Sequence, residues 1–375
     1  MNQIKLFSCI AIWLFGIMSH AALEPNKHFR FGSGDLRRIG HFSFLCPNEL
    51  NPTKQIAIIE QAPLGGVYLS VGTERGFFAL GLAGYRFQQV ILADHDPAVI
   101  YFNEINIALI EASQTLQDYL LLRLSKNVNE FQSNLSKVAY QPKPTLDLNA
   151  KEHGRWFTER MRNYKKEFIE ACSSGSLGEV YFQSEDHYQQ LRSMILEGRV
   201  VTRFLELNRA NPFGKIENEL EQAGLEISVL DLSNAWWKRY LKGRSRKFIL
   251  GPRQFHKDGI VIVTDKDLDQ DFSKNKALAL NWVYYGFHRA QLLELLDEEI
   301  GARSLERLFI QEGCLLSYFD DLENQLIDLN SWLPVVDDKL FLDQPMVEQS
   351  QEGNKDRRDS GCLMGLFDRC WPSRG

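Results

Sequence analysis

The chain has 375 residues, of which 44% are hydrophobic and 25% charged. This composition excludes wholesale disorder, collagen-like repeats and a membrane protein with many spans. The formal net charge of −6 argues against a dedicated nucleic-acid binder, so nucleic acid is not the expected partner.

The first 21 residues have the pattern of a secretory signal peptide. Lys5 precedes an uncharged run of 13 residues, Leu6 to Met18. Small residues, Ser19 and Ala21, then occupy positions −3 and −1 of a cleavage after Ala21. The run is shorter than the roughly 20 residues that cross a bilayer. We therefore expect export to the periplasm or the medium, with an uncleaved N-terminal membrane anchor as the alternative.

Strands and helices alternate along the first half of the expected domain. A polar lead-in with turn clusters occupies residues 24–60. A strand over 67–71 ends at Gly72, and a helix over 77–83 follows. A second strand, 89–93, ends at Asp94. Asp96 and Pro97 then predict the N-cap and first position of a helix that runs to about residue 110.

A segment over about 111–178 differs in character, because it is rich in Leu, Gln, Lys and Glu at helical spacing. We interpret it as a helical insertion or lid. Alternation then resumes with strands predicted at 179–182, 199–204, 227–231 and 259–264 and helices at 185–197, 214–223, 287–299 and 303–311.

The pattern as a whole predicts one α/β domain over 22–343. Short apolar runs separated by helices are typical of a Rossmann-like, doubly wound parallel sheet covered on both faces. The tail over 344–375 is polar, has no periodicity and is expected to be disordered.

Two strand ends carry residues that suit a nucleoside ligand. Ser70-Val71-Gly72-Thr73 leads through Gly76 into a helix, and glycines there allow a tight turn and a close approach of a ligand to the backbone. Asp94 lies 22 residues after Gly72, which is the offset at which a carboxylate accepts from a ribose diol. Asp96 competes for that role, but helix capping explains it better.

With these motifs the sequence resembles the class I S-adenosylmethionine-dependent methyltransferases over roughly residues 65–265. The likeness is closer to a group of bacterial secreted proteins and lipoproteins with methyltransferase-like folds, through Tyr68 to Thr73, Asp94 to Pro97 and Leu232 to Ala235. The resemblance implies S-adenosylmethionine as donor, held by Ser70, Gly72, Thr73, Gly76 and Asp94, with Glu206 near the adenine. A solvated turn is the alternative role of Glu206. Ser70 stands where the family has an acidic residue, and Glu74 where it has a glycine, which puts donor affinity in doubt.

The fourth strand end, with Ser233 and Asn234, resembles the methyl-transfer rim of the family, and these two residues are the catalytic candidates. A helix N-cap is the alternative role. The next segment, 236–247, holds six cations and no acid. Lys238 and Arg239 would attract an anionic acceptor, such as a small metabolite or a lipid headgroup. A solvated helix end explains the same cations, and contact with a membrane stays possible.

The expected activity is therefore transfer of a group, most simply methyl, from S-adenosylmethionine to an acceptor that the sequence does not name. Two alternatives stay open. An exported chain lacks this cytoplasmic donor, so a non-catalytic binding or interaction module is the second hypothesis, and aminopropyl or aminocarboxypropyl transfer is the third. The histidines and cysteines show no metal-ligand spacing, so no metal is expected.

Overall fold

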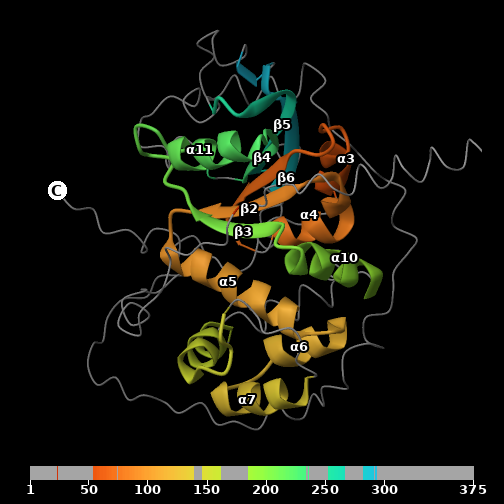
Figure 1. Cartoon of the computed structure of the whole chain (residues 1–375), viewed down its shortest axis with the longest axis vertical. Coiled ribbons are helices and arrows are strands. Elements are labelled where there is room, and N and C mark those ends of the chain that lie inside the picture. The colour runs from red at the N-terminus through yellow and green to blue at the C-terminus, as the bar shows by residue number, and fades with distance from the viewer. Residues whose placement is uncertain are drawn as a thin grey trace, which may run out of the picture.

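The computed structural model describes residues 23, 54–73, 75–138, 146–161, 185–233, 235, 252–266, 282–290 and 292–293. They contain a six-stranded sheet of order β3-β2-β1-β4-β5-β6 (Figure 1). The strands are β1 (Val67–Val71), β2 (Gln89–Asp94), β3 (Val200–Phe204), β4 (Ile227–Ser233), β5 (Phe255–Lys266) and β6 (Trp282–His288). The first five are parallel and β6 is antiparallel to β5. The predicted doubly wound α/β class is confirmed.

The central strands are near-continuous hydrophobic runs because both faces of a parallel sheet are covered. Every residue of β1, β2 and β4 is buried. Side chains alternate between two cores: Tyr68 and Leu92 pack in the first, and Leu69 and Ile91 in the second.

Helices cover both faces of the sheet, as Figure 1 shows. The first core lies under α3 (Lys54–Ile59), α4 (Arg75–Ala83), α5 (Pro97–Ala112) and α10 (Glu185–Leu196). The second lies under α11 (Gly214–Ala223). A short 3₁₀ helix, η1 (Gly84–Arg86), joins α4 to β2. Among the described helices, none has the length and apolar character needed to cross a membrane.

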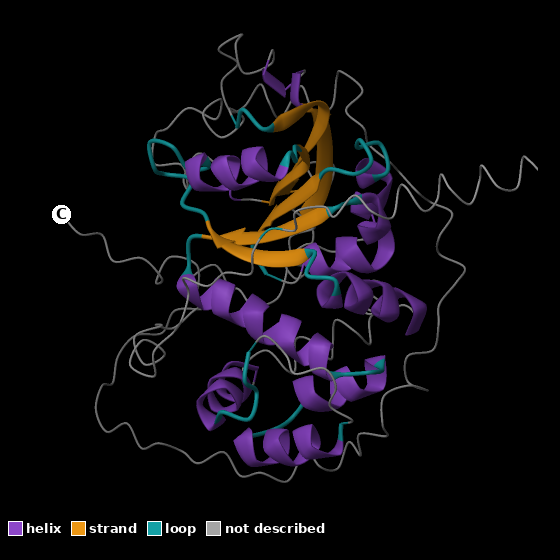
Figure 2. Ribbon diagram, viewed as in Figure 1, coloured by secondary structure: helices purple, strands orange, loops and turns teal. Residues whose placement is uncertain are grey.

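A helical layer lies beyond α5, on the side away from the sheet (Figure 2). It consists of α6 (Leu116–Arg123), α7 (Val128–Lys137) and a helix over 151–161, so the predicted insertion is helical where the structure describes it. A capping box at Thr115 starts α6. Arg123 is fully buried and donates to Asn106 Oδ1 (2.9 Å) and Tyr119 Oη (2.7 Å), which ties the layer to α5.

Three predicted elements differ from the structure. The polar lead-in contains helix α3, because Ile58 and Ile59 pack into the first core. The helix predicted from residue 287 begins later, since Phe287 and His288 pair with β5 in the unpredicted strand β6. Strand β4 continues two residues past Asp231, to Ser233.

Other predictions fall outside the described residues. These are the signal peptide over 1–21, the strand at 179–182, the helix at 303–311 and the tail over 344–375.

Candidate functional site

The carboxyl ends of β1 and β4 meet at the point where the strand order reverses. From β1 the chain crosses to β2 and β3 on one side, and then returns to β4 and β5 on the other. In open parallel sheets, ligands bind outside the carboxyl ends of the strands at such a switch point. Gly72, Asp94 and Ser233 all lie at this edge, which we call the carboxyl edge.

The turn after β1 depends on Gly72. Its φ of +111° is a conformation that side chains disfavour, and a Cβ placed there would meet nothing within 4 Å. Its N–H donates to Ala93 O (3.0 Å), and its carbonyl accepts from Asn103 Nδ2 (3.0 Å). The turn is therefore fixed from β2 and α5 while the space over Gly72 stays open. Thr73, the next residue, is buried.

Asp94 is the last residue of β2, and its two carboxylate oxygens differ in their contacts. Its Oδ1 accepts from the Asp96 N–H (2.8 Å) and lies 3.1 Å from His95 Nδ1. Its Oδ2 has no hydrogen bond to any part of the chain that the structure describes. The side chain is 12% exposed, so this oxygen is an acceptor held in place.

Two neighbours of Asp94 have different roles: Asp96 is structural, and His95 acts through its charge. Asp96 caps α5 by accepting from the Ala98 N–H (2.8 Å), as predicted, and burial raises the pKa of its carboxyl group. The hydrogen bond to Asp94 raises the pKa of His95, and the charges of Asp94, Asp96 and Glu206 act in the same direction. A cation at His95 would therefore stabilise the charge of Asp94.

A second carboxylate, Asp231, lies fully buried beside the Gly72 turn. Its Oδ2 accepts from Tyr68 Oη (2.8 Å) and, more weakly, from Ser70 Oγ (3.5 Å). A register shift between Ile227 and Val229 makes this possible, because it resets the alternation of β4 and turns Asp231 toward Tyr68. Ser70 thus binds a carboxylate of the neighbouring strand.

Ser233 ends β4 in a strained conformation. Among the described residues other than glycine it alone has a positive φ, of 50°. Its N–H donates to Asp231 Oδ1 (3.2 Å), and its Oγ lies 3.3 Å from Thr264 Oγ1 of β5. Such outliers persist where the surroundings over-determine them, and they cluster at functional sites.

Comparisons with known proteins place the chain in a family. The model described as "Domain of unknown function (DUF7790)" matches residues 44–294. The chain belongs to the DUF7790 family. A search among curated proteins found no match. Among solved structures, the rRNA methyltransferase AviRa from Streptomyces viridochromogenes is similar over 72% of this chain and 99% of its own, with 14% sequence identity and a TM-score of 0.32.

The remaining predicted site residues of the DUF7790 domain have other observed contacts. A Cβ at Gly76 would overlap Leu92 Cδ2, so this glycine lets α4 pack closely on β2. Glu206, just after β3, pairs with Arg209 (2.8 Å), whose guanidinium lies over the ring of Phe204. Phe204 pairs with Asp94 in the sheet register, which brings Glu206 to the same edge.

Three predicted residues lie outside the described part of the chain: Asn234, Lys238 and Arg239. The other predicted site residues except Gly76 lie at the carboxyl edge: Ser70, Gly72, Thr73, Asp94, Glu206 and Ser233. Across the described residues, no three His, Cys, Asp or Glu side chains gather as a metal site.

Two polar residues, Asp231 and Thr264, make contacts at this edge that the sequence did not predict. Both are fully buried and stand next to apolar residues of their strands. An acidic residue inside a buried strand signals a hydrogen-bonded partner, because an isolated buried charge is costly. Its partner, Tyr68, could not be read from the sequence.

One further acid lies below this edge, on α5. Glu104 Oε1 accepts from Thr202 Oγ1 of β3 (2.9 Å). Burial raises the pKa of Glu104 to about 7, although the hydrogen bond from Thr202 opposes the shift. A carboxyl group with a pKa near neutrality therefore contacts β3, the outermost strand of the sheet.

The helical layer contacts the first turns of α5, the end of that helix that follows Asp94. The hydroxyl of Tyr101 hydrogen-bonds to His153 Nδ1, and the Tyr101 ring packs edge-on against Trp156 at 4.7 Å between centroids. The charge of Arg160, from the same helix, opposes the rise that burial causes in the pKa of Asp96. The layer thus borders the start of α5, next to Asp94.

Proposed function

We propose that the DUF7790 domain is an S-adenosylmethionine-dependent transferase, with methyl transfer as the simplest reaction. The observation that carries the proposal is the position of the Gly72 turn beside Asp94: Val71 pairs with Ala93 in the register, and Gly72 follows β1 next to the last residue of β2. An open turn and an oriented carboxylate oxygen stand next to each other at the switch point of the sheet. A nucleoside needs this combination of a close backbone approach and an acceptor for its ribose hydroxyls.

The residues present fit the donor in part. The free Oδ2 of Asp94 would accept from the ribose hydroxyls, and the Gly72 turn would face the rest of the molecule. When bound, the donor supplies a carbon that is already electrophilic, so the chain mainly contributes proximity and alignment. Ser233, held rigidly by Asp231 and Thr264, would orient the acceptor atom.

Binding of S-adenosylmethionine to the purified chain, measured by calorimetry, tests the proposal. Asp94→Asn keeps an oxygen for the Asp96 N–H but removes the charge, and we expect it to weaken binding roughly 10- to 100-fold. Asp96→Asn is the matched control, because asparagine is also a good N-cap and should leave binding unchanged. Absence of binding to the unaltered chain would overturn the proposal.

A second candidate is a binding module without catalysis. It is favoured by Ser70 and Asp231: the serine cannot hold the donor's ammonium group by charge, and the carboxylate that it contacts is fully buried. The two functions differ in one outcome. A transferase modifies an acceptor, whereas a module without catalysis leaves the donor unconsumed.

The acceptor is proposed from charge alone. Lys238 and Arg239 belong to the basic segment 236–247, which follows β4 directly in the chain. A segment with six cations would attract an anionic small molecule or lipid headgroup. Replacing Lys238 and Arg239 by Gln should raise the KM for such an acceptor and leave donor binding unchanged.

A further inference from the structure

The edge of the sheet opposite the candidate site carries most of the exposed large apolar side chains of the described residues. They are Leu64 (70% exposed), Tyr85 (63%) and Leu196 (40%). These residues precede β1, β2 and β3 respectively, and the amino ends of parallel strands meet at one edge. We infer that this amino edge docks on the surface of a phospholipid bilayer.

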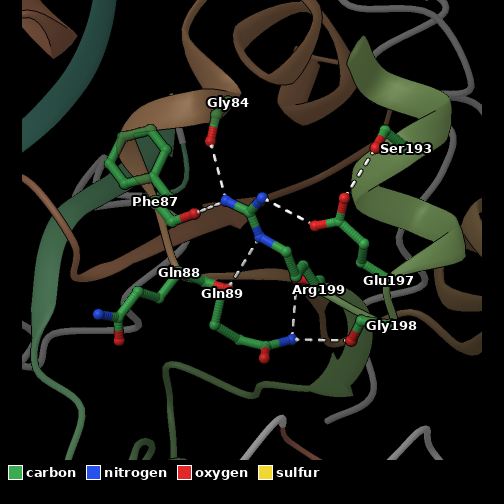
Figure 3. A network of polar contacts seen from close by, with 8 residues as sticks. All are labelled: Gly84, Phe87, Gln88, Gln89, Ser193, Glu197, Gly198 and Arg199. Carbon is green, nitrogen blue, oxygen red and sulfur yellow. Dashed lines mark hydrogen bonds and ion pairs between the residues drawn. The ribbon is translucent and has the colours of Figure 1, made fainter. Parts of the chain in front are cut away.

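The patch is preformed, because hydrogen bonds join the loops that carry it (Figure 3). The guanidinium of Arg199 donates to the carbonyls of Phe87 and Gln88 (3.2 Å to Gln88) and pairs with Glu197 (3.1 Å). These contacts connect the loop of Leu196 to that of Tyr85. Docking would therefore cost little ordering entropy.

The loop of Leu64 is joined to the same network from the other side. The Gly65 N–H donates to Arg86 O (2.7 Å), and the Gln88 N–H donates to Gly66 O (2.9 Å). Leu64 precedes Gly65 in the chain and Tyr85 precedes Arg86, so each lies next to a residue of the Gly65–Arg86 bond. The two most exposed apolar side chains are therefore held on neighbouring loops.

The chain enters the fold at this same edge. The Leu23 N–H donates to Gln89 Oε1 (3.2 Å), while Gln89 Nε2 donates to Arg199 O (2.8 Å), and the Leu23 side chain is buried in the second core. The apolar run Leu6 to Met18 ends five residues earlier. Five residues reach at most about 18 Å, so a membrane that holds this run as an uncleaved anchor, the alternative to a cleaved signal peptide, would lie within that distance of Leu23.

Charge and chemistry favour a lipid surface over an electrostatic partner. Glu60, Glu197 and Glu226 are exposed around this edge, so it offers no excess of cations to anionic lipid. Leucine and tyrosine suit the boundary between headgroups and acyl chains. In this orientation the carboxyl edge, with Gly72 and Asp94, points away from the membrane.

The test uses the full chain with phosphatidylcholine vesicles and hydroxyl-radical footprinting. We expect vesicles to protect Leu64, Tyr85 and Leu196, but not Leu121, an exposed leucine of α6. The double variant Leu64→Glu with Tyr85→Glu should partition into vesicles at least about tenfold more weakly. Leu121→Glu is the matched control and should partition like the unaltered chain. Thermal unfolding of both variants checks that they fold.

Each other outcome would overturn the inference. Absence of vesicle binding would exclude a lipid surface. Binding without protection at Leu64 and Tyr85, or undiminished binding of the double variant, would place the contact elsewhere. Protection that needs high protein concentration but no vesicles would assign the amino edge to a second copy of the chain. Donor binding, measured on the same samples, reports on the proposed function independently.

Discussion

The two edges of the sheet use polar groups in contrasting ways. At the amino edge, Arg199 and Gln89 donate to backbone carbonyls of their own loops, so the polar atoms are satisfied within the chain. At the carboxyl edge, Gly72 faces open space, Asp94 keeps one oxygen without a described partner, and Ser233 is held at a positive φ. One edge stabilises the fold, and the other keeps groups in place that the fold does not need.

The largest expected effect comes from breaking the amino edge. Arg199→Ala would leave the partly buried carbonyls of Phe87 and Gln88 without this donor, and each acceptor left unsatisfied costs about 1–3 kcal/mol. We expect a loss of roughly 4 kcal/mol in the free energy of unfolding, measured with urea. Arg209→Ala, which removes an exposed ion pair at the carboxyl edge, should cost under about 1 kcal/mol. Equal losses would contradict the contrast between the edges.

A second prediction concerns Glu104, which lies between the edges. Its pKa rises from 4.5 to about 7 in the folded protein, so the folded state holds a proton that the unfolded state releases. Stability contributed by the protonated form is present below pH 4.5 and falls as pH rises toward 7, by about 3 kcal/mol in total.

Glu104→Gln keeps an acceptor for Thr202 and removes the charge. The variant should unfold at higher temperature than the unaltered chain at pH 8, and at nearly the same temperature at pH 4. Glu226→Gln, at an exposed position, serves as the control and should change neither melting temperature. A variant that is no more stable at pH 8 would show that burial does not penalise this carboxylate.

Two glycines, one in the turn after β1 and one in the first turn of α4, allow a sharper test. Gly76→Ala should lower the free energy of unfolding by about 2 kcal/mol, because the added methyl group overlaps Leu92. Gly72→Ala meets no neighbouring atom, but it forces a side chain into φ +111° next to the proposed ligand. Calorimetry should therefore show weaker donor binding for Gly72→Ala and unchanged binding for folded Gly76→Ala. Weaker donor binding for Gly76→Ala and unchanged binding for Gly72→Ala would indicate that the ligand contacts α4 instead of the turn.

The smallest effect is expected at Ser233. Ser233→Gly relieves a strained φ, which should outweigh the loss of the hydroxyl contact with Thr264 and raise the free energy of unfolding by under about 1 kcal/mol, whereas transfer to an acceptor should fall. Ser228→Gly, in the same strand, relieves no such strain and should be destabilising by about the same amount. If Ser233→Gly were destabilising too, the strain would not be a stored cost of the site.

The sequence predicted the elements whose signals are local. Buried apolar runs predicted β1 and β2, and capping by Asp96 predicted the start of α5. The position of Asp94 at the end of β2 followed from the same runs. Strand β6 was not predicted, although Trp282 to His288 is rich in aromatic residues that favour strands.

The contacts that complete the carboxyl edge could not be predicted, because they depend on distant parts of the chain. Asp231 meets Tyr68 across 163 positions of sequence, and only after a register shift in β4. At the amino edge, the bond from Leu23 to Gln89 likewise spans 66 positions. Neither contact leaves a periodic or compositional signal.

The central claim is that the free oxygen of Asp94 holds a ribose diol. A thermodynamic cycle tests it most directly, by measuring calorimetrically how much affinity is lost when S-adenosylmethionine is replaced by an analogue without ribose hydroxyls. The loss should be roughly 10- to 100-fold for the unaltered chain and nearly absent for Asp94→Asn. An equal loss in both proteins would contradict the claim and place the hydroxyl contacts on other residues.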